Sequence, residues 1–406
     1  IRFCDWSSDV CSSDLIKEGF GATMGFIGFL IIMGAIIAVI LDKTGGALSI
    51  AMFILSKTGH KNAVPALGLT GFITGLPIFC DSGFIILSGL ARSVSAKSKI
   101  AMPFIAIVLA CALYSVHCLI PPHPGALAAA GIVKANIGIL IIAGTLFAIP
   151  GFLVSYYWVK WMTNKKSYLP AVETKIVQQN DDPNLPPVFL SLLPIAVPLI
   201  LITANSLFSL AGLDRNAILV KGIIFCGQPV IALSIGVVLA LLLLKDKTIK
   251  SVNTTFEQAI EKAGPILIIT AAGGMFGMVI KETGIGTEAG SILSESNLGL
   301  VIPFLMTFIM KTAQGSSTVA IITIAAIVSP MLPMLGLDSE WGKIFTMLAM
   351  GAGSMMISHA NDSYFWVVTK FSDIDTDITL RVYSSATIIM GVTVFICVWL
   401  VSLFVL

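Results

Sequence analysis

Two short polar stretches carry the residue types that could do chemistry in an otherwise apolar chain. Residues 77–83 read Pro-Ile-Phe-Cys-Asp-Ser-Gly, and residues 358–363 read Ser-His-Ala-Asn-Asp-Ser. Each stretch places a carboxylate and hydroxyl groups where the surrounding sequence would lie in lipid. Because an ionisable side chain is costly in hydrocarbon, such residues usually face a water-filled path or a bound solute. The pattern favours a transporter.

The elements that would position these residues are predicted to be membrane helices. The chain of 406 residues is 56% hydrophobic and only 11% charged, whereas a soluble domain carries about 25% charged residues. Several segments lack Asp, Glu, Lys and Arg over about 23 to 25 residues, which is enough helix to cross a bilayer. The sequence therefore predicts an all-α polytopic protein in contact with the lipid bilayer. These uncharged segments are 19–41, 135–159, 222–244 and 382–406.

The cysteines and the remaining motifs indicate no cofactor. Five of the seven cysteines are isolated in apolar segments, and we expect them to be buried free thiols. His117 and His123 lie on either side of a Pro-Pro break without a thiolate or carboxylate placed to complete a metal site. No Walker A pattern is present, and nothing in the charge pattern suggests a nucleic-acid partner. The five cysteines are Cys80, Cys111, Cys118, Cys226 and Cys397.

The chain divides into two halves and a foreign-looking start. Residues 1–15 are rich in Ser, Asp and Cys and have no apolar core or small-residue cleavage site, so they are not a signal peptide. We interpret them as translated sequencing-adapter sequence, in which case the native N-terminus is missing. The polar, proline-rich residues 162–187 are typical of a linker. It would join an N-terminal repeat, 16–161, to a C-terminal repeat, 188–406.

The two halves share landmarks in the same order, which predicts an internal duplication, a common basis of secondary transporters. Basic loops tend to face the cytoplasm. Counting Arg92, Lys97 and Lys99 as one such loop and residues 245–262 as another places the repeats in opposite orientation. The matched segments are 40–45 with 279–284, 80–83 with 315–318, and 120–125 with 358–363.

The first polar break is predicted to be the tip of a re-entrant hairpin. Residues 84–90 are too short to span a membrane, Pro77 removes a backbone donor, and Gly83 tolerates unusual dihedral angles. Broken backbone at membrane depth occurs only where it is buried in protein or lines a cavity. We expect Asp81 and Ser82 to contact substrate or carry a proton; the alternative is an ordinary loop at the membrane surface.

The matching tip in the second half spans residues 314–318. Gln314, Ser316, Ser317 and Thr318 offer amide and hydroxyl groups around Gly315, which suit a polyhydroxylated anion; the alternative is that the small residues only pack helices. Lys311 lies one turn earlier, and we expect it to extend to the membrane surface.

Histidines and a dense polar cluster complete the predicted site. His123, held between two prolines, is expected on the binding path, with a titration range that suits proton coupling. His117 is equally typical of a buried core histidine. The densest cluster would contribute to substrate binding, or else form a surface loop before an aromatic belt. Its members are His359, Asn361, Asp362 and Ser363.

Four motifs together resemble the gluconate:proton symporter (gluconate permease) family of the ion-transporter superfamily. The resemblance covers residues 19–406 and implies a bacterial inner-membrane symporter for sugar acids. It also implies inverted repeats with re-entrant hairpins and an elevator-like motion. The family contains D-serine permeases too, and Ser82 replaces an apolar residue frequent in gluconate permeases, so the substrate stays open. The motifs occupy 76–84, 120–125, 313–320 and 358–366.

We therefore predict proton-coupled uptake of a small carboxylate, most simply gluconate, by a chain compatible with a homo-oligomer. Asp81, His123 and Asp362 are the candidate proton carriers, and the substrate would lie between the two tips near the membrane midplane. An intramembrane hydrolase that uses Ser82 or Ser316 with a histidine, and a passive channel, are the alternatives.

Overall fold

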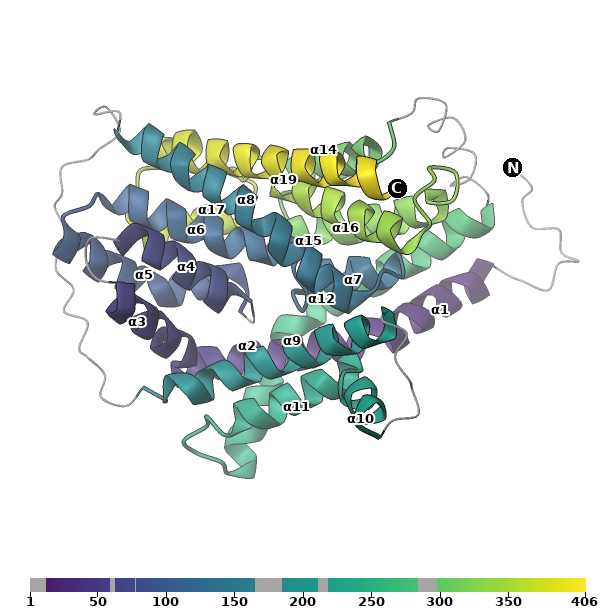
Figure 1. The fold of residues 1–406 in the computed structure, drawn as a ribbon, viewed down its shortest axis with the longest axis horizontal. Helices are drawn as coiled ribbons and strands as arrows, with labels where there is room; N and C mark the ends of the chain where they lie inside the picture. Colours follow the sequence, from purple (N-terminus) through teal and green to yellow (C-terminus); the bar gives the residue numbers. More distant parts are fainter. Residues whose placement is uncertain (1–11, 59–62, 77, 165–184, 211–217, 284–297) are drawn as a thin grey trace, which may run out of the picture.

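The computed structural model describes residues 12–58, 63–76, 78–164, 185–210, 218–283 and 298–406. Every regular element within them is helical, which confirms the all-α prediction (Figure 1). The first half contains α1 (Ser12–Thr23), η1 (Met24–Gly28), α2 (Phe29–Thr44), α3 (Gly46–Thr58), α4 (Ala63–Gly75), α5 (Cys80–Ser98), α6 (Met102–Leu119), α7 (Pro124–Ile132) and α8 (Ile137–Asn164). The second contains α9 (Val188–Leu210), α10 (Ile218–Cys226), α11 (Pro229–Leu241), α12 (Ile249–Thr283), α14 (Val301–Gln314), α15 (Ser317–Val328), η4 (Ser329–Met331), α16 (Glu340–Met355), α17 (Ser363–Phe371), α18 (Thr376–Ile378), η5 (Thr379–Tyr383) and α19 (Ser384–Val405). Residues 1–11 and most of the predicted linker lie outside the described residues.

The described part of the chain contains both long helices and helices broken by a bend. In the described part of the chain four helical stretches are long and apolar enough to cross a membrane, and two bent pairs, α2–α3 at 66° and α10–α11 at 74°, could each form one more span. The single helix predicted over 222–244 is therefore wrong. Pro229 begins α11, and a proline cannot continue a preceding helix without losing a backbone hydrogen bond.

Charged residues lie on helices more often than predicted. Helix α5 runs to Ser98 rather than ending near residue 90, so Arg92 belongs to that helix and forms an ion pair with Asp373 at 2.8 Å. Helix α12 begins at Ile249, and its Lys262 pairs with Asp42 of α2 at 3.5 Å. The two predicted loops are thus partly helical. A helix can carry these basic residues because their long side chains reach polar surroundings.

Matching helices of the two halves pack against each other in antiparallel pairs. In the α8–α19 pair, the Trp158 indole donates a hydrogen bond to Ser385 Oγ at 2.8 Å, and Gly151, two turns earlier, faces Val394. In the α2–α12 pair, Lys43 Nζ donates to Thr255 Oγ1 at 2.9 Å. Figure 1 shows α8 and α19 crossing the upper part of the molecule side by side.

The helices that follow the breaks pack reciprocally and in parallel. Helix α5 of the first half lies along α17 of the second, with the Phe84 and Tyr364 rings 6.1 Å apart. Helix α15 of the second half lies along α7 of the first, where the Ser329 hydroxyl donates to the Ile132 carbonyl at 3.2 Å. Each half thus packs one of these helices against the other half; the internal duplication and the inverted orientation of the repeats both stay predictions.

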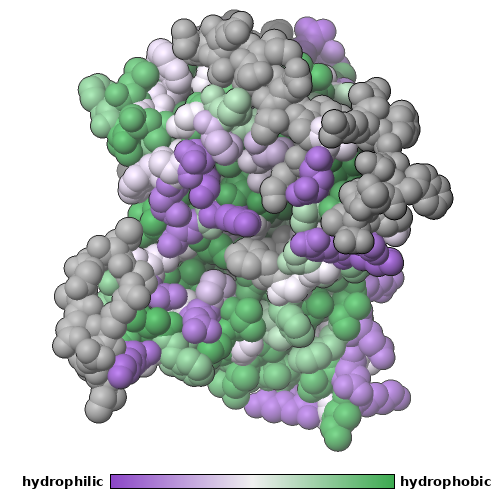
Figure 2. All heavy atoms as spheres, turned by 90° about the vertical axis from the view of Figure 1, so that its right-hand side faces the viewer, coloured by the Kyte–Doolittle hydropathy of each residue, from purple (hydrophilic) through white to green (hydrophobic). Residues whose placement is uncertain are grey.

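The short helices end inside the molecule. Helices α4 and α14 contain 13 and 14 residues, about 20 Å of helix against a hydrocarbon core of about 30 Å. Figure 2 looks onto one end of the bundle, where clusters of hydrophilic residues lie between apolar patches. The short helices therefore bring their polar ends to the interior.

Candidate functional site

Four helix breaks meet in the centre of the molecule. They are residues 76 and 78–79 between α4 and α5, 120–123 between α6 and α7, 315–316 between α14 and α15, and 356–362 between α16 and α17. The His117–Thr318 hydrogen bond, the close approach of Gly125 to the Thr318 backbone and an electrostatic interaction between Asp81 and Asp362 connect them across the two halves. The predicted meeting of the polar breaks is thus seen in the structure.

A buried ion pair forms the core of the C-terminal half of this centre. Lys311 Nζ lies 2.8 Å from Asp362 Oδ2, and the two side chains are 0% and 6% exposed. The ammonium also donates to the Gly315 carbonyl. The prediction that Lys311 extends to the membrane surface is therefore wrong, because a carboxylate and a freed helix-end carbonyl together balance the cost of burying its charge.

Asp362 has a full set of partners. Its Oδ2 also accepts from the Ser358 hydroxyl at 2.6 Å, and its Oδ1 accepts from the Tyr364 amide at 3.0 Å, which caps α17. A cap of this kind satisfies one of the free amides at a helix start. Asp362 therefore holds the α16–α17 break onto α14 and positions α17 at the same time.

The tip between α14 and α15 approaches the α16–α17 break at backbone distance. Gly315 adopts φ +93°, and a Cβ at this position would lie 2.1 Å from the Asn361 carbonyl oxygen. Asn361 Nδ2 donates to the Thr312 carbonyl at 2.8 Å. Only glycine fits this contact, both for space and for backbone conformation.

The other residues of the predicted second tip define the start of α15. Ser316 caps the helix by accepting from the Val319 amide at 3.3 Å, and Gln314 Nε2 donates to the Ser316 carbonyl. Ser317 is buried, whereas Gln314, Ser316 and Thr318 are half-buried. The tip therefore presents partly accessible amide and hydroxyl groups at a helix N-terminus.

The two histidines form a chain of hydrogen bonds that joins three breaks. His123 Nε2 lies 2.5 Å from the Gly75 carbonyl, the two Nδ1 atoms lie 3.3 Å apart, and His117 Nε2 lies 3.3 Å from Thr318 Oγ1. A carbonyl can only accept, so His123 carries a proton on Nε2. With both rings neutral, His123 accepts at Nδ1, and His117 donates from Nδ1 and accepts from the Thr318 hydroxyl.

Asp81 differs from Asp362 because its carboxylate is not saturated. Its Oδ1 is buried and has no hydrogen-bond partner within the described part of the chain. It lies in the first turn of α5, near enough to Asp362 for the carboxylates to interact electrostatically. A buried polar atom without a partner is costly, so Oδ1 is the atom in this centre that gains most from a proton or a donor on a solute.

The neighbours of Asp81 complete the first tip. Ser82 is half-buried beside it, and Gly83 is buried against Leu113 of α6, where a Cβ would meet Leu113 Cδ2 at 3.1 Å. Pro77 lies outside the described residues. The tip is thus the first turn of a long helix rather than the head of a short return arm.

Not every predicted residue joins the network. His359 is half-buried and Ser363 is exposed at the first position of α17, and neither links the breaks through the hydrogen bonds described above. Two residues that sequence reasoning left out do so: His117 and Lys311. The available signal was a lysine one turn before a Gly-Ser tip and a histidine one turn before a Pro-Pro break.

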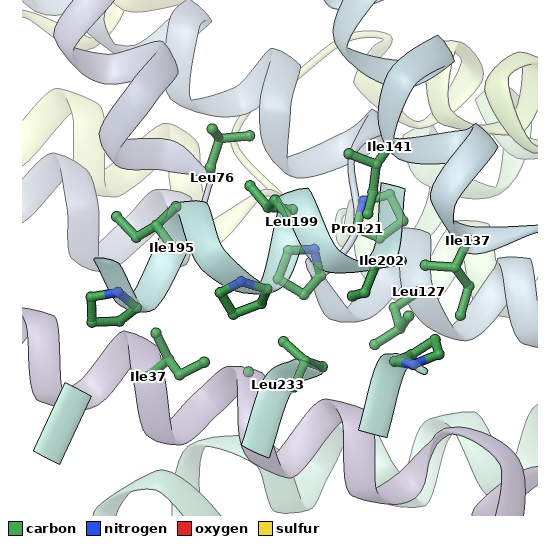
Figure 3. Close-up of a pocket in the computed structure, with 15 residues that line it drawn as sticks. Ile37, Leu76, Pro121, Leu127, Ile137, Ile141, Ile195, Leu199, Ile202 and Leu233 are labelled. Carbon is green, nitrogen blue, oxygen red and sulfur yellow. The ribbon is translucent and has the colours of Figure 1, made fainter. Parts of the chain in front are cut away.

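An apolar crevice separates this centre from α2, α9 and α11. In Figure 3 the labelled side chains around it are all aliphatic or proline, with Leu76 and Pro121 contributed by two of the breaks. Ile37 comes from α2, Leu199 from α9 and Leu233 from α11. A smaller crevice beside it reaches His123 and Phe79. The polar centre therefore lies next to a dry contact surface.

Membrane-length helices, interior helix breaks and a buried polar centre define a membrane transporter. The comparisons with known proteins agree: residues 8–404 match the family model described as GntP family permease. The chain belongs to the GntP family of permeases, which are transporters and not enzymes. The alternative of an intramembrane hydrolase is therefore wrong.

Relatives extend over nearly the full chain. An inner membrane permease, YgbN, of Escherichia coli K12 is 32% identical over 94% of this chain and 87% of its own. A gluconate permease of Pseudomonas aeruginosa is 28% identical over 95% and 87%, and the D-serine transporter DsdX of Escherichia coli O6:H1 is 29% identical over 93% and 85%. Among solved structures, the YdaH transporter of Alcanivorax borkumensis shares the fold, with a TM-score of 0.62 at 15% identity over 98% of this chain and 90% of that chain.

Proposed function

We propose that this chain carries gluconate or a related sugar acid into the cell across the bacterial inner membrane, together with a proton. Relatives named as gluconate permease, L-idonate transporter and inner membrane permease support this substrate class and location. The D-serine transporters among the relatives keep a hydroxylated amino acid as the second candidate. Both candidates are small carboxylates with hydroxyl groups.

The observation that carries the proposal is the charge of the polar centre. Asp81 and Asp362 bring two carboxylates, Lys311 brings one ammonium, and the neutral His117–His123 chain adds none. The centre is therefore one positive charge short even before an anion enters. An anionic substrate would raise the excess to two negative charges in a low-dielectric interior, where each unpaired charge is costly. A proton taken up with the substrate offsets one of them.

Of the predicted proton carriers, Asp81 suits the task best. Asp362 already accepts three hydrogen bonds, one of them from Lys311, and His123 is held between Gly75 and His117. Oδ1 of Asp81 has no partner to give up. The substrate hydroxyls would contact Ser82 and the residues of the second tip, namely Gln314, Ser316, Ser317 and Thr318, with His359, Asn361 and Ser363 at the edge of the site.

The apolar crevice suits a movement of the site against α2, α9 and α11. The residues that line it are glycine, proline, leucine and isoleucine, so their side chains bring no polar groups that such a movement would have to separate. Apolar surfaces can shift relative to each other at low cost, provided that water stays excluded. A site that moves as one body would expose the same breaks to either side of the membrane.

Uptake into proteoliposomes tests the proposal. Labelled D-gluconate should accumulate when the proton gradient is directed inward and should only equilibrate without it. Preloaded unlabelled gluconate should still drive counterflow, which a passive channel would not support. Competition by L-idonate and D-serine ranks the substrates. Uptake that is saturable but indifferent to the gradient would contradict proton coupling, and no uptake of any of the three acids would contradict the substrate class.

A further inference from the structure

We propose that Lys311 is the residue that binds the carboxylate of the substrate, and that Asp362 occupies its place while the site is empty. The inference rests on the proposed function in one respect, namely that the transported solute is a carboxylate. It assigns the substrate's charged end to a specific group and gives the buried ion pair a part in transport. Lys311 is the cation that the described polar centre offers to an anion.

The environment of the ion pair permits such an exchange. When Lys311 separates from Asp362, the carboxylate keeps the Ser358 hydroxyl and the Tyr364 amide as donors, at 2.6 and 3.0 Å. The ammonium keeps the Gly315 carbonyl. Both groups therefore keep hydrogen bonds while Lys311 exchanges one carboxylate partner for another, which lowers the cost of separating a buried ion pair.

The exchange keeps Lys311 paired throughout, because one carboxylate replaces another beside the same ammonium. Asp362 keeps its negative charge, so the centre gains only the charge that the substrate brings. A solute of the same shape without a charge could not displace Asp362, because it would leave Lys311 with a neutral partner. The arrangement therefore selects carboxylates over their amides.

Access to Lys311 lies along the contact between α14 and the α16–α17 break. Asn361 is exposed there, and its side chain bonds the Thr312 carbonyl one residue beyond Lys311. Thr318 and Ser316, which begin α15, are half-buried on the same tip. Separation at Asn361 would open the ammonium to a solute already held by these hydroxyl groups.

The test measures binding of D-gluconate and of its neutral amide, gluconamide, to purified full-length protein in detergent. The double variant Lys311→Met with Asp362→Asn removes one charge of each sign, so it leaves the net charge of the centre unchanged and should fold. We expect the wild type to prefer gluconate by about a hundredfold, the size of effect that a buried charge pair typically has. The double variant should bind both compounds alike.

Asp362→Asn alone provides a second measurement. With the internal competitor gone, gluconate should bind about tenfold more tightly, the factor that corresponds to 1.4 kcal/mol of lost competition. Lys262→Met is the matched control, since it removes a lysine from the partly exposed pair with Asp42, and it should preserve the wild-type preference. Should D-serine prove to be the substrate, D-serine replaces gluconate and its amide replaces gluconamide in both measurements.

The outcomes separate the two proposals. If the wild type binds neither acid, the proposed function fails. If the wild type binds gluconate but the double variant keeps the full preference over gluconamide, the function stands and the role of Lys311 is overturned. A weaker affinity in Asp362→Asn would overturn the role of Asp362 as a stand-in for the substrate.

Discussion

The two halves of the chain bring equivalent breaks to the centre but leave them in different states. In the C-terminal half Ser316 caps α15 and Asp362 caps α17, and Asp362 is further bonded to Lys311 and Ser358. In the N-terminal half neither α5 nor α7 has a side-chain cap. A buried oxygen of Asp81 has no hydrogen-bond partner among the described residues.

The difference teaches how two sets of helix breaks in one chain can divide the work of a site. The C-terminal breaks are held in a satisfied network, which suits a site that positions a solute. The N-terminal breaks keep free amides and an unsatisfied carboxylate, and such groups gain most from a ligand or a proton. The predictions below break or sharpen this contrast.

The largest effect is expected where the two C-terminal breaks touch. Gly315→Ala places a Cβ 2.1 Å from the Asn361 carbonyl oxygen and imposes φ +93° on an alanine, which should cost about 3 kcal/mol or more. We expect little folded protein in the membrane and no uptake. Gly336→Ala is the control, because Gly336 also has positive φ but open space around it, and it should cost about 1 kcal/mol. Equal yields of folded protein from the two variants would contradict the close approach of Gly315 to Asn361.

Asp81→Asn should abolish coupling but spare the fold. The amide can neither take up the proton nor change charge, so gluconate should equilibrate without accumulating when a gradient is applied. Counterflow should persist, because the C-terminal network is untouched. Asp377→Asn serves as the control, since Asp377 is exposed and pairs with Arg381 on the same helical surface. Full accumulation of gluconate by Asp81→Asn would show that a group other than Asp81 carries the proton.

The histidine chain should behave as one unit. His123→Ala leaves the Gly75 carbonyl without its donor and the His117 Nδ1–H without its acceptor, at a cost of about 1–3 kcal/mol. Adding His117→Ala removes the second unsatisfied group, so the double variant should cost less than the sum of the single ones. Thermal unfolding in detergent measures all three. Strict additivity would show that the rings do not interact.

The smallest effect is expected at Ser358. Ser358→Ala removes one of the three hydrogen bonds to Asp362 and should lower stability by about 1 kcal/mol. It should also slightly weaken gluconate binding, because the Asp362 carboxylate that the substrate displaces from Lys311 then lacks the Ser358 hydroxyl as a donor. Ser56→Ala, which removes an exposed hydroxyl bonded to its own helix, is the matched control. A larger loss of stability in Ser56→Ala than in Ser358→Ala would contradict a stabilising role for the buried hydrogen bond to Asp362.

Much of the fold could be predicted because its signals are local. Uncharged runs of membrane length predicted the helices, and Pro or Gly within polar stretches predicted breaks near residues 80, 120, 315 and 360. The bend between α10 and α11 was missed because Gly227 and Pro229 lie in a run whose apolar character alone suggests one helix. The extent of α5 was missed because Arg92 and its neighbours look like a loop. In the structure Arg92 pairs with Asp373 and donates a hydrogen bond to the Phe371 carbonyl, 279 residues further along the chain.

The sequence by itself determined that the chain crosses a membrane, where its helices break and which family it belongs to, since apolar length and backbone chemistry act over neighbouring residues. Only the tertiary structure decided which polar groups neutralise one another. Lys311 finds its partner 51 residues further along the chain, and His117 meets Thr318 across the two halves. The cost of an unpaired charge depends on how deeply it is buried. Burial in turn depends on contacts between helices that are far apart in the sequence, and only folding brings those helices together.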